Sequence, residues 1–225
     1  MNKRKRYFEP HYRILDRSIN KTGIAEFGPM SSFTWNSDPK RLLFVLSRYK
    51  FAAKVLEGCK NVIEIGCGDG FASRIVRQHV SKLMLVDADP LMINHAMKIQ
   101  SNQFNVEFAI HDFSKNKYKN IGFDGAYMLD VLEHIPKKIE KKFINNLRSS
   151  LKEGAKFVVG MPSLESQKFA SPGSKAGHVN CKTKEELYKF LSSSFKSVTC
   201  YSMNDEVIHT GFSRMSNYIF AICVK

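Results

Sequence analysis

The sequence predicts an α/β protein with a doubly wound, seven-stranded sheet that is mostly parallel, and three observations support this. Apolar strands alternate with amphipathic helices through residues 59–160, as in parallel sheets covered by helices. The first of these strands runs directly into a glycine-rich turn at residues 66–70. The last two expected strands have no helix between them, so they should form a hairpin that adds one antiparallel strand.

The composition fits a single domain over residues 1–225. With 43% hydrophobic residues, the chain can bury one substantial core. We expect a helical cap over residues 1–58, a core over 59–160, and a loop, helix and hairpin over 161–225. No apolar run approaches the roughly 18 residues of a membrane helix, and no signal peptide is evident. The five scattered cysteines form no C-x-x-C pair, which favours a reducing cytoplasm over disulfides or zinc.

The chain is strongly basic, with a formal net charge of +14 and a pI of about 9.6. One interpretation is a polyanionic partner such as RNA, or a substrate that carries phosphate. The other is a set of solvated lysines, which we favour because the lysines are spread over the expected helices. We therefore expect no nucleic-acid partner, and a monomer or a homodimer.

The elements follow one another with recognisable start signals. Asp38 followed by Pro39 is typical of a helix N-terminus, and this helix should end near Gly58. Thr183 and Glu186 form a capping box for a later helix. The other expected helices cover residues 70–79, a segment from Pro90, and 137–151. The expected strands cover residues 61–65, 83–86, 105–109, 123–128, 157–159, 197–203 and 217–224.

The turn after the first strand is the most informative stretch of the chain. Residues 62–70 read V-I-E-I-G-C-G-D-G, with glycine at alternate positions. A dinucleotide-binding turn would need a third glycine at position 71, which is Phe71. The E-x-G-x-G-x-G string resembles instead the first motif of the Rossmann-like S-adenosylmethionine-dependent methyltransferases.

Acidic residues follow the other strands at the edge where ligands bind in such sheets. Asp87 ends the second strand, where a carboxylate can accept both ribose hydroxyls. Asp112 follows the third strand, where its oxygen and the next N–H can contact an adenine ring. Glu64 lies inside the first strand, where its charge can help to hold a cationic group. Taken alone, an acid at a strand end reads as a turn former or helix cap. The glycine turn, Asp87, Asp112 and the segment 129–135 after the fourth strand together favour a nucleoside site.

The resemblance to the methyltransferase fold spans about residues 60–160 and includes the string D-V-L-E-H-I after the fourth strand. It implies that S-adenosylmethionine is the cofactor, with S-adenosylhomocysteine as product. The residues that it assigns to cofactor binding are Glu64, Gly66, Cys67, Gly68, Asp87, Ala88, Asp112, Phe113, Leu129 and Asp130. Outer segments at 30–41, 162–167, 177–182 and 202–212 also look like a bacterial subfamily associated with surface-polysaccharide (capsule or lipopolysaccharide) biosynthesis.

Histidines at the same edge are the candidates for removing a proton from an acceptor hydroxyl. His134 lies four residues after Asp130, so one helical turn would place both on one face. His178 lies in a long loop, and such loops often form lids or binding sites. A helix-capping His134 and a solvated His178 are the structural alternatives. We predict catalytic roles for His134, Asp130 and His178, and no metal site, although Asp205, Glu206 and His209 offer a weak candidate.

Substrate binding is expected from residues of both outer segments and of the terminal hairpin. Trp35 can stack on the acceptor or cover the cofactor, and Arg41, Lys175 and Lys182 can neutralise a phosphate on it. A buried or solvated role is the alternative for each. The predicted substrate-binding residues are Trp35, Arg41, His178, Asn180, Asp205, Glu206 and His209.

The sequence thus predicts an O-methyltransferase that acts on a small, anionic, phosphate- or nucleotide-bearing precursor of a surface polysaccharide. A methyltransferase for RNA or for a quinone-type small molecule is one alternative, and the D-V-L-E-H-I string resembles the quinone-type enzymes too. The Asn/Asp-Pro-Pro-Tyr/Phe string of many RNA base methyltransferases is absent. A non-catalytic, cofactor-binding partner subunit is the alternative from another class.

Overall fold

The structure is a computed structural model that describes residues 9–100, 104–119 and 122–225. Its helices are α1 (Tyr12–Thr22), α2 (Pro29–Ser37), α3 (Pro39–Val55), α4 (Ser73–Arg77), α5 (Pro90–Lys98), α6 (Lys137–Arg148), α7 (Pro172–Gly177) and α8 (Lys184–Ser192). Its strands are β1 (Asn61–Ile65), β2 (Lys82–Asp87), β3 (Glu107–Ile110), β4 (Phe123–Leu129), β5 (Leu151–Pro162), β6 (Ser197–Asn204), β7 (Val207–His209) and β8 (Tyr218–Val224). Short 3-10 turns are η1 (Leu132–His134), η2 (Glu165–Phe169) and η3 (Ser213–Met215).

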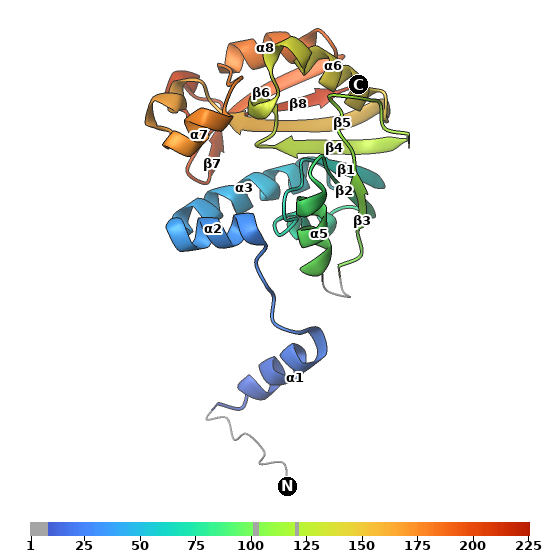
Figure 1. The fold of residues 1–225 in the computed structure, drawn as a ribbon, viewed down its shortest axis with the longest axis vertical. Helices are drawn as coiled ribbons and strands as arrows, with labels where there is room; N and C mark the ends of the chain where they lie inside the picture. The colour runs from blue at the N-terminus through green and yellow to red at the C-terminus, as the bar shows by residue number, and fades with distance from the viewer. Residues whose placement is uncertain (1–8, 101–103, 120–121) are drawn as a thin grey trace.

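The strands form one sheet in the order β3-β2-β1-β4-β5-β8-β6-β7 (Figure 1). The first five strands of this order are parallel, and β8 runs antiparallel to both β5 and β6. The predicted α/β fold and the pairing of the two C-terminal strands are confirmed. The sheet has eight strands rather than seven because residues 207–209 pair with β6 as an extra edge strand.

Local signals decide where several helices begin. Asp38 and Asp89 each accept a hydrogen bond from an N–H in the first turn of α3 and of α5, at 3.2 and 2.8 Å. Thr183 and Glu186 form the predicted capping box of α8. Helices α4 and α6 are shorter than predicted, and β5 begins at residue 151 rather than 157.

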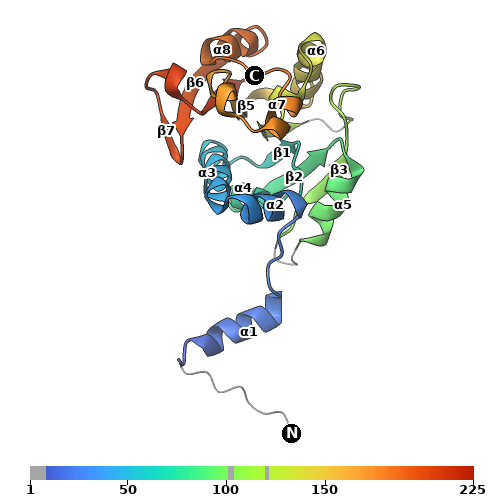
Figure 2. The ribbon, with the colours of Figure 1, turned by 60° about the vertical axis from the view of Figure 1, so that its left-hand side comes forward.

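Helices cover both faces of the sheet, and each face has its own hydrophobic core (Figures 1 and 2). On one face α3, α4 and α5 contribute Tyr49, Val76 and Ile93. On the other face α6 and α8 contribute Phe143 and Leu187. This three-layer arrangement places the carboxyl ends of the parallel strands at one edge, and Figure 1 shows α7 beside the arrowheads of β4 and β5.

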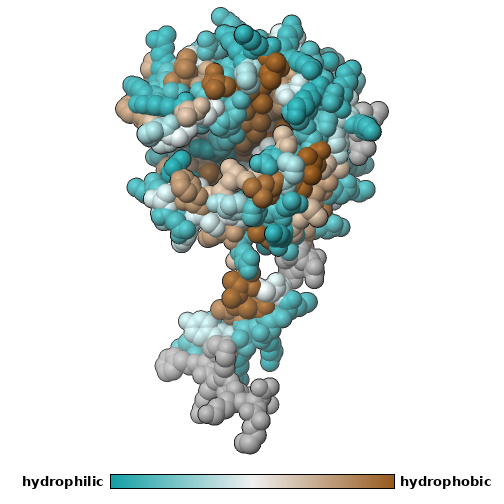
Figure 3. Space-filling view, viewed as in Figure 1, coloured by the Kyte–Doolittle hydropathy of each residue, from teal (hydrophilic) through white to brown (hydrophobic). Residues whose placement is uncertain are grey.

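The N-terminal helices differ in their contacts with this body. α2 packs against α3, whereas α1 projects away from the sheet in both ribbon views (Figures 1 and 2). Ile14, Leu15 and Ile19 of α1 are exposed, and Figure 3 shows apolar surface on this projecting segment. In the described part of the chain, no helix combines the length and the apolar character that crossing a membrane requires.

Candidate functional site

The glycine-rich turn follows β1 and is covered by the beginning of α2. Gly66, Gly68 and Gly70 have φ values of 71°, 54° and 68°, a region that residues with a side chain rarely adopt. Asp69, which is buried in the turn, accepts hydrogen bonds from the N–H (2.8 Å) and the hydroxyl (3.2 Å) of Ser31. This carboxylate therefore holds the N-terminus of α2 against the turn.

Two partly exposed carboxylates lie beside the turn, at the ends of β2 and β3. Asp87 accepts a hydrogen bond of 2.9 Å from the N–H of Gly68, which joins β2 to the turn. Asp112 accepts one of 2.8 Å from the N–H of Ser114 and lies 3.3 Å from Nζ of Lys115. Burial opposes ionisation of Asp112, but these contacts outweigh burial and lower its pKa.

Three other residues assigned to the cofactor by sequence lie at the same strand ends. Ala88 is exposed directly after β2, and Leu129 ends β4 with a buried side chain. The ring of Phe113 is buried in the core, so only its backbone faces the edge. Cys67 is also buried, and it contributes to the site through the backbone of the turn.

Glu64 lies in β1 beneath the turn, and its carboxylate is buried. Tyr49 donates a hydrogen bond to one oxygen (2.8 Å) and Tyr127 to the other (2.5 Å). Burial raises the pKa of Glu64 to about 7 although both tyrosines favour the ionised form, and the charge of Asp87 adds to the rise. Both oxygens are used inside the core, so Glu64 can offer a ligand its charge, which is the role that the sequence predicted for it, but no free acceptor oxygen.

The buried Glu64 should make stability depend on pH. The folded protein keeps this proton up to a pH of about 7, whereas an unfolded chain releases it near 4.5. The folded state therefore binds more protons in this window, and the free energy of unfolding falls by up to roughly 3 kcal/mol as pH rises from about 5 to 7. Urea unfolding at a series of pH values should show that Glu64→Gln loses this component of the pH dependence. Glu107→Gln, on an exposed part of β3, should keep the wild-type dependence; equal profiles for both variants would contradict the assignment.

Asp130 does not share a helical face with His134, contrary to the prediction from sequence. Its φ of 58° is left-handed, and the residues that follow form the 3-10 turn η1 rather than an α-helix. Asp130 pairs instead with Arg48 of α3 at 2.8 Å. The Arg48 guanidinium lies 3.9 Å from the centre of the Tyr218 ring. The left-handed backbone turns the Asp130 side chain toward α3, and such strained residues are common at functional sites.

Three side chains that could hold a metal come together beside this pair. Glu133, His134 and His178 each offer a ligand atom within 4.8 Å of those of the other two. Nδ1 of His134 lies 2.9 Å from the carbonyl oxygen of Gly177, and Nδ1 of His178 lies 2.8 Å from the side-chain oxygen of Gln167. The sequence predicted both histidines as site residues but expected no metal there.

The members of this cluster differ in burial. Glu133 is fully buried, and burial, followed by the charge of Asp130, raises its pKa well above the usual value. Burial and the neighbouring His134 lower the pKa of His178, which favours the neutral ring. His134 is exposed. The cluster thus opens from a buried carboxyl group toward the surface.

The long loop that carries His178 is fixed by buried polar contacts. The N–H of Asn180 donates to the carbonyl oxygen of Glu133 (2.9 Å), and its side chain donates to Glu140 (2.6 Å). Lys182 pairs with the same Glu140 at 2.7 Å and is almost completely buried. Asn180 and Lys182 therefore anchor the loop to α6. Neither is free for the substrate contact or the phosphate contact that the sequence predicted.

The other predicted substrate residues are spread over separate parts of the molecule. Trp35 is half-exposed on α2, with its ring 5.8 Å from that of Phe27, and Arg41 is exposed on α3. The ring of His209 closes the β6–β7 hairpin, because it lies 2.9 Å from Asn204 and accepts the N–H of Gly211. Asp205 and Glu206 form the exposed tip of this hairpin. The hairpin residues have local roles and do not join the histidine cluster.

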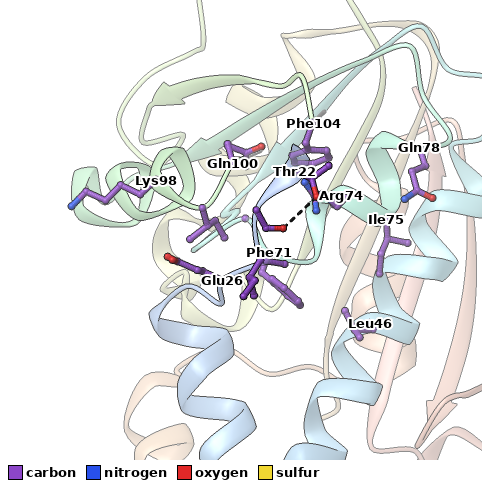
Figure 4. Close-up of a pocket in the computed structure, with 15 residues that line it drawn as sticks. Thr22, Glu26, Leu46, Phe71, Arg74, Ile75, Gln78, Lys98, Gln100 and Phe104 are labelled. Carbon is purple, nitrogen blue, oxygen red and sulfur yellow. Dashed lines mark hydrogen bonds between the residues drawn. The ribbon is translucent and has the colours of Figure 1, made fainter. Parts of the chain in front are cut away.

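A cavity of about 570 Å³ borders the end of the glycine-rich turn, where Gly70 and Phe71 line it (Figure 4). It is bounded by residues 22–26, by α4 and by the end of α5, and Figure 4 shows Glu26, Phe71 and Arg74 around it. Asp87, Asp112 and Asp130 are not among its lining residues. We therefore place the functional site at the carboxyl edge of the sheet and not in this cavity.

Three residues that organise the site, Asp69, Arg48 and Glu133, were not predicted as site residues. Asp69 stands inside the glycine motif, but nothing near it indicates that its partner is Ser31. No local pattern singles out Arg48 as a site residue. The apolar residues of α3 predict the helix, but they do not indicate which of its polar residues has a function. Glu133 was visible only as part of the D-V-L-E-H-I string. A search for acids next to predicted strand ends would have found Asp69 and Glu133.

Comparisons with known proteins agree with this arrangement. Residues 62–154 match the family model described as "Methyltransferase domain". The ubiquinone biosynthesis O-methyltransferase of Coxiella burnetii (strain RSA 331 / Henzerling II) is 27% identical over 152 residues, which are 64% of this chain and 62% of that protein. The chain thus spans less than two thirds of the length of this relative.

Solved structures share the fold at low sequence identity. The N-methyltransferase NodS from Bradyrhizobium japonicum WM9, in complex with S-adenosyl-L-homocysteine, superimposes with a TM-score of 0.65 and 18% identity. That match covers 96% of this chain and 99% of NodS. The plantazolicin methyltransferase BpumL, in complex with the same product, gives a TM-score of 0.64 at 14% identity, over 96% of this chain and 93% of BpumL. Residues 62–154 thus match a methyltransferase domain, and the chain as a whole has the Rossmann-like fold of these solved structures.

Proposed function

We propose that this protein is an S-adenosylmethionine-dependent O-methyltransferase that acts on a hydroxyl group of a small molecule. The observation that carries the proposal is the set of carboxylates at one edge of a basic protein. Glu64, Asp87, Asp112 and Asp130 all lie at or beneath the ends of neighbouring strands, although the net charge of the chain is +14. Such a site suits a cationic ligand that also carries hydroxyl and amino groups.

The residues present fit this cofactor group by group. Asp87 accepts one backbone N–H on each oxygen, from Gly68 and from Asp89, and keeps further acceptor capacity, as ribose hydroxyls require. Asp112 and the backbone of Phe113 follow β3, where an adenine ring would lie. Glu64, when ionised, supplies negative charge on the side of β1 and β4, where the cationic end would lie, and Asp130 lies on the same side in its pair with Arg48.

The chain must align the acceptor and accept or release its proton. When bound, the cofactor supplies a methyl group on a positively charged sulfur. The histidine cluster lies at the end of β4, on the side of the site away from Asp87 and Asp112. The neutral His178 and the exposed His134 lie on the side of the site where an acceptor hydroxyl would lose its proton. Loop 163–182, which carries His178, would cover the acceptor at the end of β4.

The relatives favour a quinol-type phenol as the acceptor. The ubiquinone biosynthesis enzymes in the comparison are O-methyltransferases, and the D-V-L-E-H-I string resembles quinone-type enzymes. Leu164, Phe169 and Val179 are exposed apolar side chains on or beside the loop, which suits an apolar acceptor. Burial of Lys182 removes one of the cations that a phosphate-bearing acceptor would use. The polysaccharide precursor remains a prediction from the outer sequence segments.

Ligand-dependent thermal unfolding provides the test. S-adenosylmethionine and S-adenosylhomocysteine should raise the melting temperature with increasing concentration, whereas NADH should not, because only the first two match the site. Turnover of a radiolabelled methyl group should then be measured with catechols and quinols and with nucleotide-linked sugars. Stabilisation by NADH alone would contradict the cofactor. Turnover of sugars but not of phenols would overturn the acceptor class.

A further inference from the structure

The cluster of Glu133, His134 and His178 has the features of a metal site. Glu133 and His134 are adjacent in η1, and His178 comes from the distant loop between β5 and α8. The loop is held in place by the bond from Asn180 to the backbone of Glu133. Ligand atoms of the three side chains converge within 4.8 Å. We propose that Glu133, His134 and His178 bind a divalent metal ion at the carboxyl edge of the sheet.

Both histidines are oriented by hydrogen bonds that leave the other ring nitrogen available. Nδ1 of His134 faces the carbonyl oxygen of Gly177, and Nδ1 of His178 faces the amide oxygen of Gln167. A carbonyl oxygen only accepts, so each Nδ1 carries the proton and each Nε2 has a free lone pair. Metal-binding histidines usually donate their second N–H to such an oxygen.

The orientation of Gln167 is itself determined by its surroundings. Its amide nitrogen lies 3.2 Å from the carbonyl oxygen of Ser163 and 3.3 Å from the hydroxyl of Ser166. The amide oxygen must therefore point to His178. This bond is a feature of a built site, because it fixes the ring of a half-buried loop residue.

Glu133 lacks the partners that a buried carboxyl group normally has. Within the described residues, neither of its oxygens has a hydrogen-bond partner, and both are buried. The nearby cation Arg48 is committed to Asp130 at 2.8 Å and to the ring of Tyr218. A cation between Glu133 and the histidines would give these oxygens a partner and neutralise the charge.

The donor set indicates the class of metal. Two imidazoles and one carboxylate suit Mn²⁺, Fe²⁺ or Zn²⁺ better than Ca²⁺, which prefers oxygen ligands alone. Three protein ligands leave coordination positions open for another molecule.

The ion gives the acceptor a route to ionisation, and this step rests on the proposed function. The acceptor hydroxyl binds an open position, its pKa falls, and its proton passes to solvent. The oxygen then forms a bond to the methyl carbon while the carbon–sulfur bond breaks, and the electron pair of that bond stays on sulfur. The positively charged sulfur becomes a neutral thioether, with no change of oxidation state at the metal. Metal coordination thus replaces the general base that the sequence predicted.

Titration of the full chain with MnCl2 after treatment with EDTA tests the site without cofactor or acceptor. Mn²⁺ is the appropriate probe because it binds thiols weakly, and the chain has five free cysteines. Calorimetry should give one Mn²⁺ per chain, and electron paramagnetic resonance should show nitrogen coupling. Glu133→Gln and His178→Ala should each weaken binding by at least about 100-fold, and Gln167→Leu, which keeps the ligands, by roughly 10- to 100-fold.

His79→Ala is the matched control. His79 also lies beside a glutamate, with Nδ1 3.0 Å from Glu57, but that carboxylate is exposed and already hydrogen-bonded. This variant should bind Mn²⁺ as the wild type does. Wild-type binding that needs millimolar Mn²⁺, or equal affinity in His178→Ala and His79→Ala, would overturn the proposal.

Binding of S-adenosylhomocysteine to the same samples separates this proposal from the proposed function. Samples that bind the product but not Mn²⁺ would refute the metal site alone. Samples that bind Mn²⁺ at these residues but not the product would refute the methyltransferase and leave the metal site. Gln167→Leu keeps the test valid if the buried Glu133 variant does not fold.

Discussion

Asp87→Ala is expected to weaken the binding of S-adenosylhomocysteine by at least about tenfold, equivalent to roughly 1.4 kcal/mol. The substitution removes the carboxylate that would accept hydrogen bonds from the ligand hydroxyls. It also removes the acceptor of the 2.9 Å hydrogen bond from the N–H of Gly68 in the glycine turn. Both changes should affect the same ligand, because the turn is proposed to bind it through its backbone. Isothermal titration calorimetry on the folded variant measures the effect.

Two further variants make this result specific. Asp89→Ala removes a carboxylate two residues away, but that group caps α5 by accepting the N–H of Leu91 at 2.8 Å. It should cost about 1 kcal/mol of stability while the affinity stays near the wild-type value. Asp87→Asn keeps one acceptor oxygen for the turn and should fall between the wild type and Asp87→Ala. Equal affinity in all of these proteins would remove Asp87 from the cofactor site.

Lys182→Met is expected to lower the free energy of unfolding by roughly 3–5 kcal/mol, as is usual when one partner of a buried ion pair is removed. Glu140 would keep its 2.6 Å bond from Asn180 but would lose its only charge partner within the described residues. The loop that carries His178 should loosen together with this anchor. Urea unfolding gives the loss, and hydrogen exchange should show faster exchange in residues 163–182.

Lys54→Met provides the comparison for an exposed ion pair. Lys54 lies 3.4 Å from Glu57, and both side chains are more than half exposed. Because solvent screens such a pair, its loss should have little effect on the free energy of unfolding. The double variant Lys182→Met with Glu140→Gln should recover part of the loss, since no charge is then left buried alone. A Lys182→Met protein as stable as Lys54→Met would show that the buried pair does not hold the loop.

Local patterns were sufficient for most of the fold. The strand at 61–65, the helix start at Asp38 and the capping box of Thr183 each depend on neighbouring residues, and the structure has all of them. The predicted acids at the strand ends lie along one edge because parallel strands bring their carboxyl ends together. The eighth strand was missed because residues 207–209 are too short for an alternating pattern and are ordered by pairing with β6.

The details of the site needed the tertiary structure. Spacing alone placed Asp130 and His134 on one helical turn, but the left-handed backbone at Asp130 directs it to Arg48. Spacing also gave no reason to exclude Asn180 from the substrate site. Its side chain proved to be a loop anchor, because Glu140 of α6 lies within hydrogen-bond distance.

The sequence by itself determined the fold class, the glycine turn and the acids at the strand ends, because these follow from periodicity and backbone conformation within short segments. Only the tertiary structure decided which polar groups meet. In the folded chain Glu133 and His134 lie beside His178, and Lys182 pairs with the buried Glu140. These contacts join residues far apart in the chain, and their energies depend on burial and distance, which no local pattern encodes.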